Sequence, residues 1–218
     1  MTNKSAIVLG ATGLIGSHLL KQLLADESYG KVTVLVRRPL EIDDPKFEQH
    51  VVDFADLSSI APLMKADDVF CCLGTTHKKA GSKEAFYAVD FTLVHELAKL
   101  AKAGDCEHSL MVSSIGANPK ASSSYMKTKG EIEQAIADLN FPRTSIFRPS
   151  LLLGERKEYR VGEGLSEAFM RPLAPLMLGP LKRYRPIAAA QVAKGMIATA
   201  HLKGQGLEVY QSDQIAGM

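Results

Sequence analysis

Residues 6–20 read AIVLGATGLIGSHLL, and this stretch decides the fold. The apolar run 6–9 is typical of a buried strand, and residues 14–25 have the apolar spacing of a helix. Between them lie Gly10, Gly13 and Gly16. The first permits a tight turn, the second lets backbone N–H groups approach a pyrophosphate, and the third lets the helix lie close to the strand. Strand, glycine loop and helix in this order predict a phosphate-binding βαβ unit, whereas the alternative is a turn whose glycines serve packing alone.

The same alternation continues along the chain. Apolar runs predict further strands at 32–36, 47–52, 68–73, 108–112, 144–147 and 207–210, and helical patterns lie at 57–64, 84–103, 124–139 and 188–201. Runs that are continuously apolar suit parallel strands covered on both faces. We therefore expect an α/β protein with a doubly wound parallel sheet, the Rossmann fold. Residues 1–218 are expected to form a single domain, in which 150–218 is a small C-terminal elaboration that builds the substrate pocket.

Composition limits the function classes. Of 218 residues, 46% are hydrophobic and 23% charged, as in ordinary globular domains, and the net charge is +2. This balance gives no support for a nucleic-acid or membrane-surface partner. Cys71, Cys72 and Cys106 have no metal-ligand spacing, so neither a metal nor a disulfide framework is expected. The N-terminus has only a four-residue apolar run before its first glycine, too short for a signal-peptide core, and no stretch approaches the length of a membrane span, so we expect a cytoplasmic protein.

The end of the second strand indicates which dinucleotide binds. Arg37 and Arg38 follow the run 32–36, where an acidic residue usually holds a free 2′-hydroxyl. Two guanidinium groups instead suit a 2′-phosphate, which favours NADP over NAD. The alternative is a pair of solvated arginines. Asp53, after the third strand, is a candidate partner for the adenine amino group, and a turn residue is an equal alternative.

A tyrosine and a lysine supply the candidate chemistry. Ser113 and Ser114 end the fifth strand, and Tyr125 and Lys129 lie four residues apart in the next predicted helix, hence on one face. A nearby ammonium makes a tyrosine hydroxyl a usable proton donor or acceptor, and a serine hydroxyl can polarise a carbonyl. The Tyr-x-x-x-Lys pattern is common, but its place downstream of a glycine loop makes a catalytic role the favoured interpretation.

With these residues in view, the chain resembles an atypical short-chain dehydrogenase/reductase. It is most similar to the Tat-interacting-protein oxidoreductase-like group of the NAD(P)-binding epimerase/dehydratase superfamily. The resemblance covers about 70% of the chain and is carried by GATGLIGSHLL (10–20), VLVRRP (34–39), CCLGTT (71–76), VSSIGA (112–117), YMKTKGEIE (125–133) and FRPSLLLGER (147–156).

The resemblance implies roles for individual residues. Ser114, Tyr125 and Lys129 would be catalytic. The residues expected to contact the cofactor are Gly10, Thr12, Gly13, Leu14, Ile15, Gly16, Arg37, Arg38, Asp53, Leu73, Gly74, Thr75, Tyr125, Lys129 and Pro149. One departure is Asp90, which stands where many relatives have an asparagine that completes a proton relay.

Other candidates carry less weight. His77, Lys78 and Lys79 could lie at the mouth of the site, but a solvated loop is the favoured interpretation. Arg156 and Arg160 could contact an anionic substrate, although a solvated face is slightly favoured. Leu93, Leu97 and Leu100 form an apolar stripe that is most simply core, while a homodimer interface is the alternative.

We therefore expect an NADP-dependent oxidoreductase that acts on a small carbonyl or alcohol. The alternative is an NADP-binding regulatory or redox-sensing protein that acts through protein partners with little turnover. A shared fold does not separate the two, but the complete Ser114, Tyr125 and Lys129 set favours chemistry.

Overall fold

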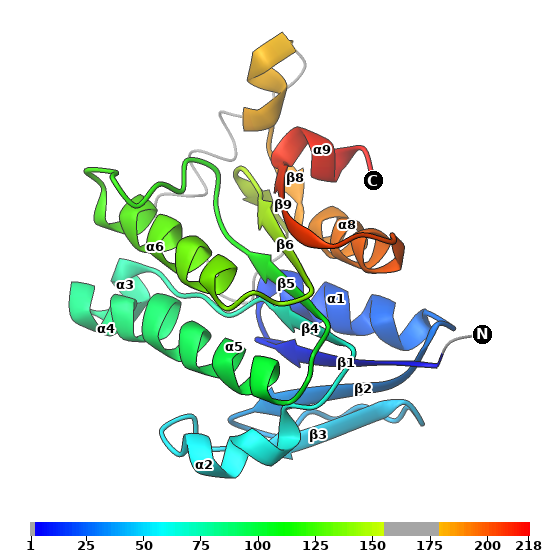
Figure 1. The fold of residues 1–218 in the computed structure, drawn as a ribbon. Helices are drawn as coiled ribbons and strands as arrows, with labels where there is room; N and C mark the ends of the chain where they lie inside the picture. Colours follow the sequence, from blue (N-terminus) through cyan, green and yellow to red (C-terminus); the bar gives the residue numbers. More distant parts are fainter. Residues whose placement is uncertain (1–2, 155–178) are drawn as a thin grey trace.

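Parallel strands joined by helices form the body of the molecule (Figure 1). The structure is a computed structural model that describes residues 3–154 and 179–218. Within these residues, seven strands form one parallel sheet in the order β3-β2-β1-β4-β5-β6-β9. They are β1 (Lys4–Leu9), β2 (Tyr29–Val36), β3 (Phe47–Val51), β4 (Asp68–Cys71), β5 (His108–Val112), β6 (Arg143–Arg148) and β9 (Gly206–Gln211). The predicted doubly wound sheet is confirmed.

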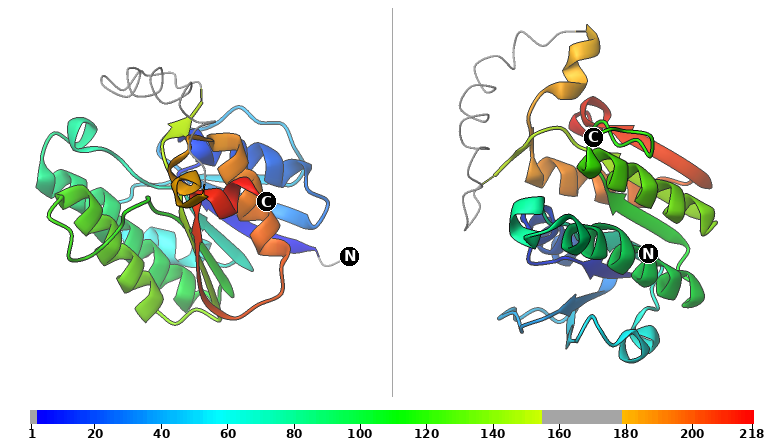
Figure 2. Two further views of the ribbon diagram at one scale, coloured as in Figure 1. Left: turned by 90° about the horizontal axis from the view of Figure 1, so that it is seen from above. Right: turned by 90° about the vertical axis from the view of Figure 1, so that its left-hand side faces the viewer.

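Helices cover both faces of the sheet (Figures 1 and 2). On one face lie α1 (Leu14–Ala25) and α8 (Ala189–His201), and on the other lie α5 (Val94–Ala103), α6 (Ser124–Asp138) and the short α2 (Leu57–Ile60) with η1 (Ala61–Leu63). Alternate residues of β1 feed the two layers: Ala6 and Val8 pack with α1, whereas Ile7 and Leu9 pack with α5. This double burial explains why the strand is continuously apolar in sequence.

The predicted helix at 84–103 exists, but it contains an irregular turn. It consists of α4 (Lys83–Tyr87), a π-helical segment η2 (Ala88–Leu93) and then α5, and the short α3 (His77–Ala80) precedes it. The π segment widens the turn, so residues after it are rotated relative to a regular α-helix. Leu97 is fully buried against the sheet, and Leu93 and Leu100 pack against the same core. The apolar stripe of this helix is therefore core.

The C-terminal part completes the far edge of the sheet. β9 pairs with β6, and α8 packs against α1. Three features were not predicted from sequence: the small sheet of β7 (Leu152–Leu153) and β8 (Ile187–Ala188), the 3-10 helix η4 (Gly179–Tyr184), and α9 (Ser212–Ala216). Arg156 and Arg160, the candidate contacts for an anionic substrate, lie outside the described residues. No helix among those described is long and apolar enough to cross a membrane.

Candidate functional site

The carboxyl ends of the parallel strands bring the predicted site residues to one edge of the sheet. β2 and β4 flank β1, so the chain leaves β1 toward one side and later returns on the other. Such a reversal opens a crevice at the carboxyl ends, where nucleotides bind in doubly wound folds. The carboxyl ends of β1 and β4 lie side by side, because the Cys72 N–H, just after β4, donates to the Leu9 carbonyl at 2.8 Å.

Gly10 and Gly16 are required by the packing of the protein itself. Gly10 has φ +84°, and a Cβ there would lie 2.8 Å from the Cys72 carbonyl group and the Leu73 nitrogen. A Cβ on Gly16 would lie 2.1 Å from the Gly10 oxygen. Both positions therefore exclude any side chain, which fixes the glycine loop against β4 and against the start of α1.

Gly13 is under a weaker constraint. A Cβ there would approach the Gly10 oxygen at 3.3 Å, which a small shift could relieve. Gly13 is the N-cap of α1 and, with Thr12, is exposed, and no side chain caps this helix end. Free N–H groups at a helix N-terminus attract anions. The loop therefore fits a pyrophosphate, and glycine at this position leaves the approach open.

The neighbouring loop residues differ in exposure. Ile15 is buried in the core, so only its backbone can face a ligand, whereas Leu14 is half-buried. A Cβ on Gly154 would lie 2.8 Å from Leu14 Cδ1, so the chain beyond β7 passes against the start of α1. The start of α1 is thus bordered by residues from both halves of the chain.

The residues expected around the adenosine end are at the surface. Arg37 and Arg38 are exposed at the end of β2, and within the described residues neither forms an ion pair. Asp53 is exposed, and one of its carboxylate oxygens accepts the Ala55 N–H at 2.9 Å, which closes a turn. That bond matches the turn interpretation of Asp53 and leaves its second oxygen for a ligand.

The centre of the site is a buried ion pair between Lys129 and Asp90. Lys129 Nζ lies 2.7 Å from Asp90 Oδ1, and the two side chains are 7% and 0% exposed. The other Asp90 oxygen accepts the Thr75 N–H at 2.7 Å. A Cβ on Gly74 would lie 3.4 Å from Asp90 Oδ1 and 3.6 Å from Lys129 Nζ, so the loop after β4 lies against the pair.

Burial and the charge of Asp90 shift the pKa of Lys129 in opposite directions. Burial lowers the pKa of its ammonium, but the negative charge of Asp90, with help from Tyr125, raises that pKa above its ordinary value. The lysine is therefore held in its charged form. Burial raises the pKa of the nearby Cys71 thiol to about 11, so this group is neutral at physiological pH.

Tyr125 lies one turn before Lys129 on α6 and is half-buried. Its ring is 5.5 Å from that of Phe86, and the Phe86 ring is 4.2 Å from that of His77. His77 Nε2 lies 3.1 Å from Ser124 Oγ, which ties α3 to the start of α6. The expectation of a solvated loop is wrong for His77, whereas Lys78 and Lys79 are exposed.

Ser114 lies in the loop between β5 and α6. A Cβ on Gly130 of α6 would lie 2.2 Å from the Asn118 carbonyl carbon, so this glycine lets the loop lie against the helix. The Pro149 carbonyl accepts the Ile115 N–H at 3.0 Å, which joins the ends of β5 and β6. Among the described residues, Ser114 and Tyr125 form no hydrogen bond with each other; Ser114 Oγ donates weakly to the Ile115 carbonyl at 3.4 Å.

A second buried network, which sequence reasoning missed, supports this arrangement. Ser113 Oγ donates to Glu133 at 2.5 Å, and Arg148 of β6 contacts the same carboxylate through Nε at 2.9 Å and Nη2 at 2.5 Å. Glu133 is only 8% exposed. The spacing of Glu133, four residues after Lys129, could have indicated from the sequence that it lies on the same helix face. The network fixes the orientation of the helix that carries Tyr125 and Lys129.

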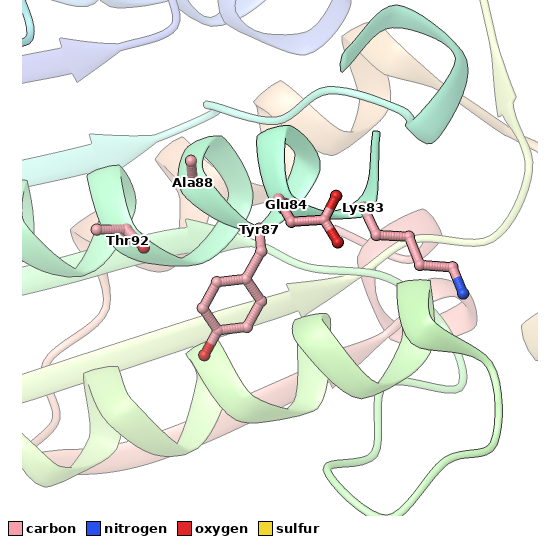
Figure 3. Close-up of a pocket in the computed structure, with 5 residues that line it drawn as sticks. All are labelled: Lys83, Glu84, Tyr87, Ala88 and Thr92. Carbon is pink, nitrogen blue, oxygen red and sulfur yellow. The ribbon is translucent and has the colours of Figure 1, made fainter. Parts of the chain in front are cut away.

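A hollow of about 420 Å³ lies elsewhere, on the outer face of α4 and η2 (Figure 3). It is lined by Lys83, Glu84, Tyr87, Ala88 and Thr92, and Tyr87 extends toward α6. Burial and the charge of Glu131 raise the pKa of Tyr87. All lining residues come from one helical stretch, and none comes from the glycine loop or the Lys129 region. We therefore place the candidate site at the sheet edge instead.

The geometry agrees with the family to which the sequence is related. A family model described as NAD(P)H-binding matches residues 10–174, about three quarters of the chain. The chain belongs to the NAD(P)H-binding family. Protein HTATIP2 from Rattus norvegicus is 44% identical over 177 residues, which are 79% of this chain and 73% of the relative. FMP52 from Candida glabrata is 43% identical over 168 residues, 75% and 70% of the two chains.

Solved structures support the fold. MoeE5 in complex with UDP-glucuronic acid and NAD superposes with a TM-score of 0.71 at 18% identity, over 94% of this chain and 75% of that one. A UDP-galactose 4-epimerase superposes with a TM-score of 0.68 at 19% identity, over 95% and 77%. Both structures are less than 20% identical to this chain, so they support its Rossmann-type fold. The recognised family is confirmed by the NAD(P)H-binding model and by the identity to HTATIP2.

The expectation of a cytoplasmic protein is wrong. Several relatives, including FMP52 of Candida glabrata, Candida albicans and Lodderomyces elongisporus, are named mitochondrial proteins. The expectation rested on unpaired cysteines and on the lack of a long apolar run. Cys71, Cys72 and Cys106 are free thiols in the structure. Free thiols suit any reducing compartment, so composition could not distinguish the cytoplasm from mitochondria.

Proposed function

We propose that this chain is an NADP-dependent oxidoreductase that acts on a small carbonyl or alcohol. One observation carries the proposal: the loop 72–75 contacts the glycine loop at one end and the Lys129–Asp90 pair at the other. A Cβ on Gly10 would meet Cys72, and a Cβ on Gly74 would meet Lys129. A dinucleotide extended along this loop would therefore have its pyrophosphate near α1 and its nicotinamide end near Lys129.

The binding roles follow from position and charge. The N-terminus of α1, with Gly10, Thr12, Gly13 and Gly16, would hold the pyrophosphate. Arg37 and Arg38 would pair with the 2′-phosphate, and their exposed guanidinium groups have no competing partner among the described residues. The remaining cofactor contacts in the proposal are Leu14, Ile15, Asp53, Leu73, Gly74, Thr75 and Pro149.

The chemical roles belong to α6 and the loop before it. When bound, the cofactor supplies or accepts a hydride. Tyr125 exchanges a proton with the substrate oxygen, and Ser114 donates a hydrogen bond to the same oxygen. Lys129 holds the ribose hydroxyls of the nicotinamide half with its ammonium. The Ser113–Glu133–Arg148 network fixes the helix and so keeps these groups in register.

Calorimetry and a carbonyl screen test the proposal. NADPH should bind at least about tenfold more tightly than NADH, since a charged hydrogen bond contributes about 1.5–3 kcal/mol. Equal affinities would contradict the role of Arg37 and Arg38. A screen of aldehydes and ketones that follows NADPH consumption should find turnover. Tight NADPH binding with no turnover on any of them would favour the alternative, a regulatory protein that acts through partners.

The division of the chain and its location are parts of the same proposal. Residues 150–218 would form the substrate pocket within a single domain, and the names of the FMP52 relatives favour mitochondria as the compartment. Fractionation of cells that produce the tagged protein tests the location, and recovery outside mitochondria would contradict it.

A further inference from the structure

Asp90 is placed by an unusual piece of helix. It lies in the π segment η2 and is completely buried. Single π turns are rare in proteins, but those that occur are often found at functional sites. One carboxylate oxygen faces Lys129 Nζ at 2.7 Å, and the other accepts the Thr75 N–H at 2.7 Å. Both oxygens thus contact groups of the candidate site.

Among residues 3–154 and 179–218, few titratable groups interact with Lys129. Asp90 of η2 is the anion, Cys71 of β4 is a neutral thiol, and Tyr125 on α6 is the remaining titratable neighbour. His77 of α3 reaches Ser124. An ammonium that faces a carboxylate at 2.7 Å leaves little net positive charge for a third group. Asp90 therefore offsets the positive charge that Lys129 would otherwise present to Tyr125, one turn earlier on the same helix face.

We propose that Asp90 is a positioning residue that neutralises Lys129, keeps Tyr125 protonated, and so adapts the site to carbonyl reduction. This inference rests on the proposed function. In reduction, the carbonyl carbon gains a hydride from the reduced cofactor and its oxygen gains the Tyr125 proton. The products are an alcohol, the oxidised cofactor and a tyrosinate that regains its proton from water. Oxidation of an alcohol needs that tyrosinate at the outset, and it should therefore reach its full rate only at higher pH.

The decisive variant is Asp90→Asn, because an amide oxygen can still accept the Thr75 N–H while the charge is gone. Ultraviolet absorbance of tyrosinate is followed against pH in the protein without cofactor. The signal of Tyr125 is isolated by subtracting the same titration in a Tyr125→Phe background. Proton loss from Tyr125 should move about one pH unit lower in Asp90→Asn, since an opposite charge nearby shifts an ionisation by about 1–3 units.

Control variants separate charge from structure. Asp138→Asn makes the same change on an exposed residue of α6 and should leave the titration unchanged. The double variant Asp90→Asn/Lys129→Met removes both members of a neutral pair, so its Tyr125 titration should stay close to that of the wild type. This second variant also tests the proposal if Asp90→Asn alone does not fold.

Two outcomes overturn the proposal. One is a Tyr125 titration in Asp90→Asn that is unchanged or moves to higher pH, which would mean that Lys129 releases its own proton instead. The other is a large shift in the double variant. Because the titration needs no turnover, either result leaves the proposed oxidoreductase function standing. Conversely, a shift without any turnover would retain the electrostatic role and reject the function.

Discussion

A lysine–aspartate pair lies at the amino ends of the strands (the amino edge) and another at their carboxyl ends (the carboxyl edge), and the two pairs differ in how many hydrogen bonds the protein supplies to them. At the amino edge, Lys4 Nζ lies 2.7 Å from Asp68 Oδ2 and also donates to the Ala200 carbonyl at 3.2 Å. The Tyr29 hydroxyl donates to the same Asp68 oxygen at 2.5 Å, and His108 lies 3.7 Å from the other. Each charge at this edge therefore has partners supplied by the protein.

At the carboxyl edge, the Lys129–Asp90 pair lies beside the loop 72–75 and the candidate cofactor crevice. Asp90 Oδ1 faces the lysine but, within the described residues, accepts no well-aligned hydrogen bond. Removing one member of a fully bonded pair leaves its partners unsatisfied and destabilises the fold, whereas a carboxylate oxygen without a hydrogen bond can still accept one from a ligand. We infer that the amino edge serves stability and the carboxyl edge serves function.

The largest expected effect is on turnover. Tyr125→Phe should lower turnover about 10³-fold, which is about 4 kcal/mol in the activation barrier, because the proton donor is lost. NADPH affinity and the free energy of unfolding should change little, since the ring still packs against Phe86. Tyr87→Phe, in the outer hollow, is the matched control and should keep wild-type turnover. Full activity of Tyr125→Phe would refute the assignment of Tyr125.

The next effect belongs to the amino edge. Asp68→Asn should lower the free energy of unfolding by about 3 kcal/mol, because the partly buried Lys4 loses its counter-charge and the buried Tyr29 hydroxyl loses a charged acceptor. Urea denaturation measures this loss, and Asp138→Asn is the exposed control. The folded variant should bind NADPH as the wild type does. A weakened NADPH affinity would show that the two edges are not independent.

A smaller effect concerns cofactor choice. Arg37→Ala/Arg38→Ala should weaken NADPH binding about 30-fold, or about 2 kcal/mol, and leave NADH binding unchanged. Stability should be unaffected because both side chains are exposed. Lys65→Ala removes another exposed cation and serves as the control. If the affinities for NADPH and NADH fell equally, the two arginines would not be the groups that bind the 2′-phosphate.

The smallest effect is a pH dependence at the amino edge. Burial, followed by the charges of Arg143 and Lys4, lowers the pKa of His108 from 6.5 to about 3. Below pH 6.5, His108 therefore binds a proton in the unfolded chain but not in the folded protein. The free energy of unfolding thus falls as the pH falls toward 3. His108 alone should cost about 1.4 kcal/mol at pH 5.5.

The raised pKa of Asp68, caused chiefly by burial, opposes this loss, because the folded protein gains a proton there as pH falls. His108→Gln should flatten the dependence measured by urea denaturation at pH 7.5 and 5.5, and His18→Gln should not. An unchanged slope in His108→Gln would mean that another group governs the acid sensitivity.

Much of the fold was accessible from sequence because it depends on local patterns. The apolar runs predicted the strands of the sheet, and the glycine spacing predicted the loop at Gly10, whereas its contact with the end of β4 came from the structure. The π turn was not predicted, because residues 88–93 carry no sequence signal that distinguishes it from a regular helix. The pairing of Asp90 with Lys129 was missed for the same reason.

The roles of individual site residues remain predictions, and they differ in how much of their setting could be foreseen. Tyr125 and Lys129 share a helix, so their spacing was sufficient to place them on one face. Ser114 lies in a separate loop, whose later part rests on α6 where Gly130 leaves room for Asn118 and Pro119. The spacing of Glu133 from Lys129 indicated only their shared helix face, whereas its contacts with Ser113 and Arg148 join three elements and depend on tertiary packing.

The sequence by itself determined the order of strands and helices, the glycine loop and the arginines that follow β2, because each depends on neighbours within a few residues. Only the tertiary structure decided which charges meet. Strand register sets Lys4 beside Tyr29 and Asp68 beside His108, and it thereby builds the amino-edge cluster. The carboxyl-edge pair needs η2 and α6 to pack together. Burial then makes these contacts strong, since a charge removed from water needs a partner that only the folded chain can bring to it.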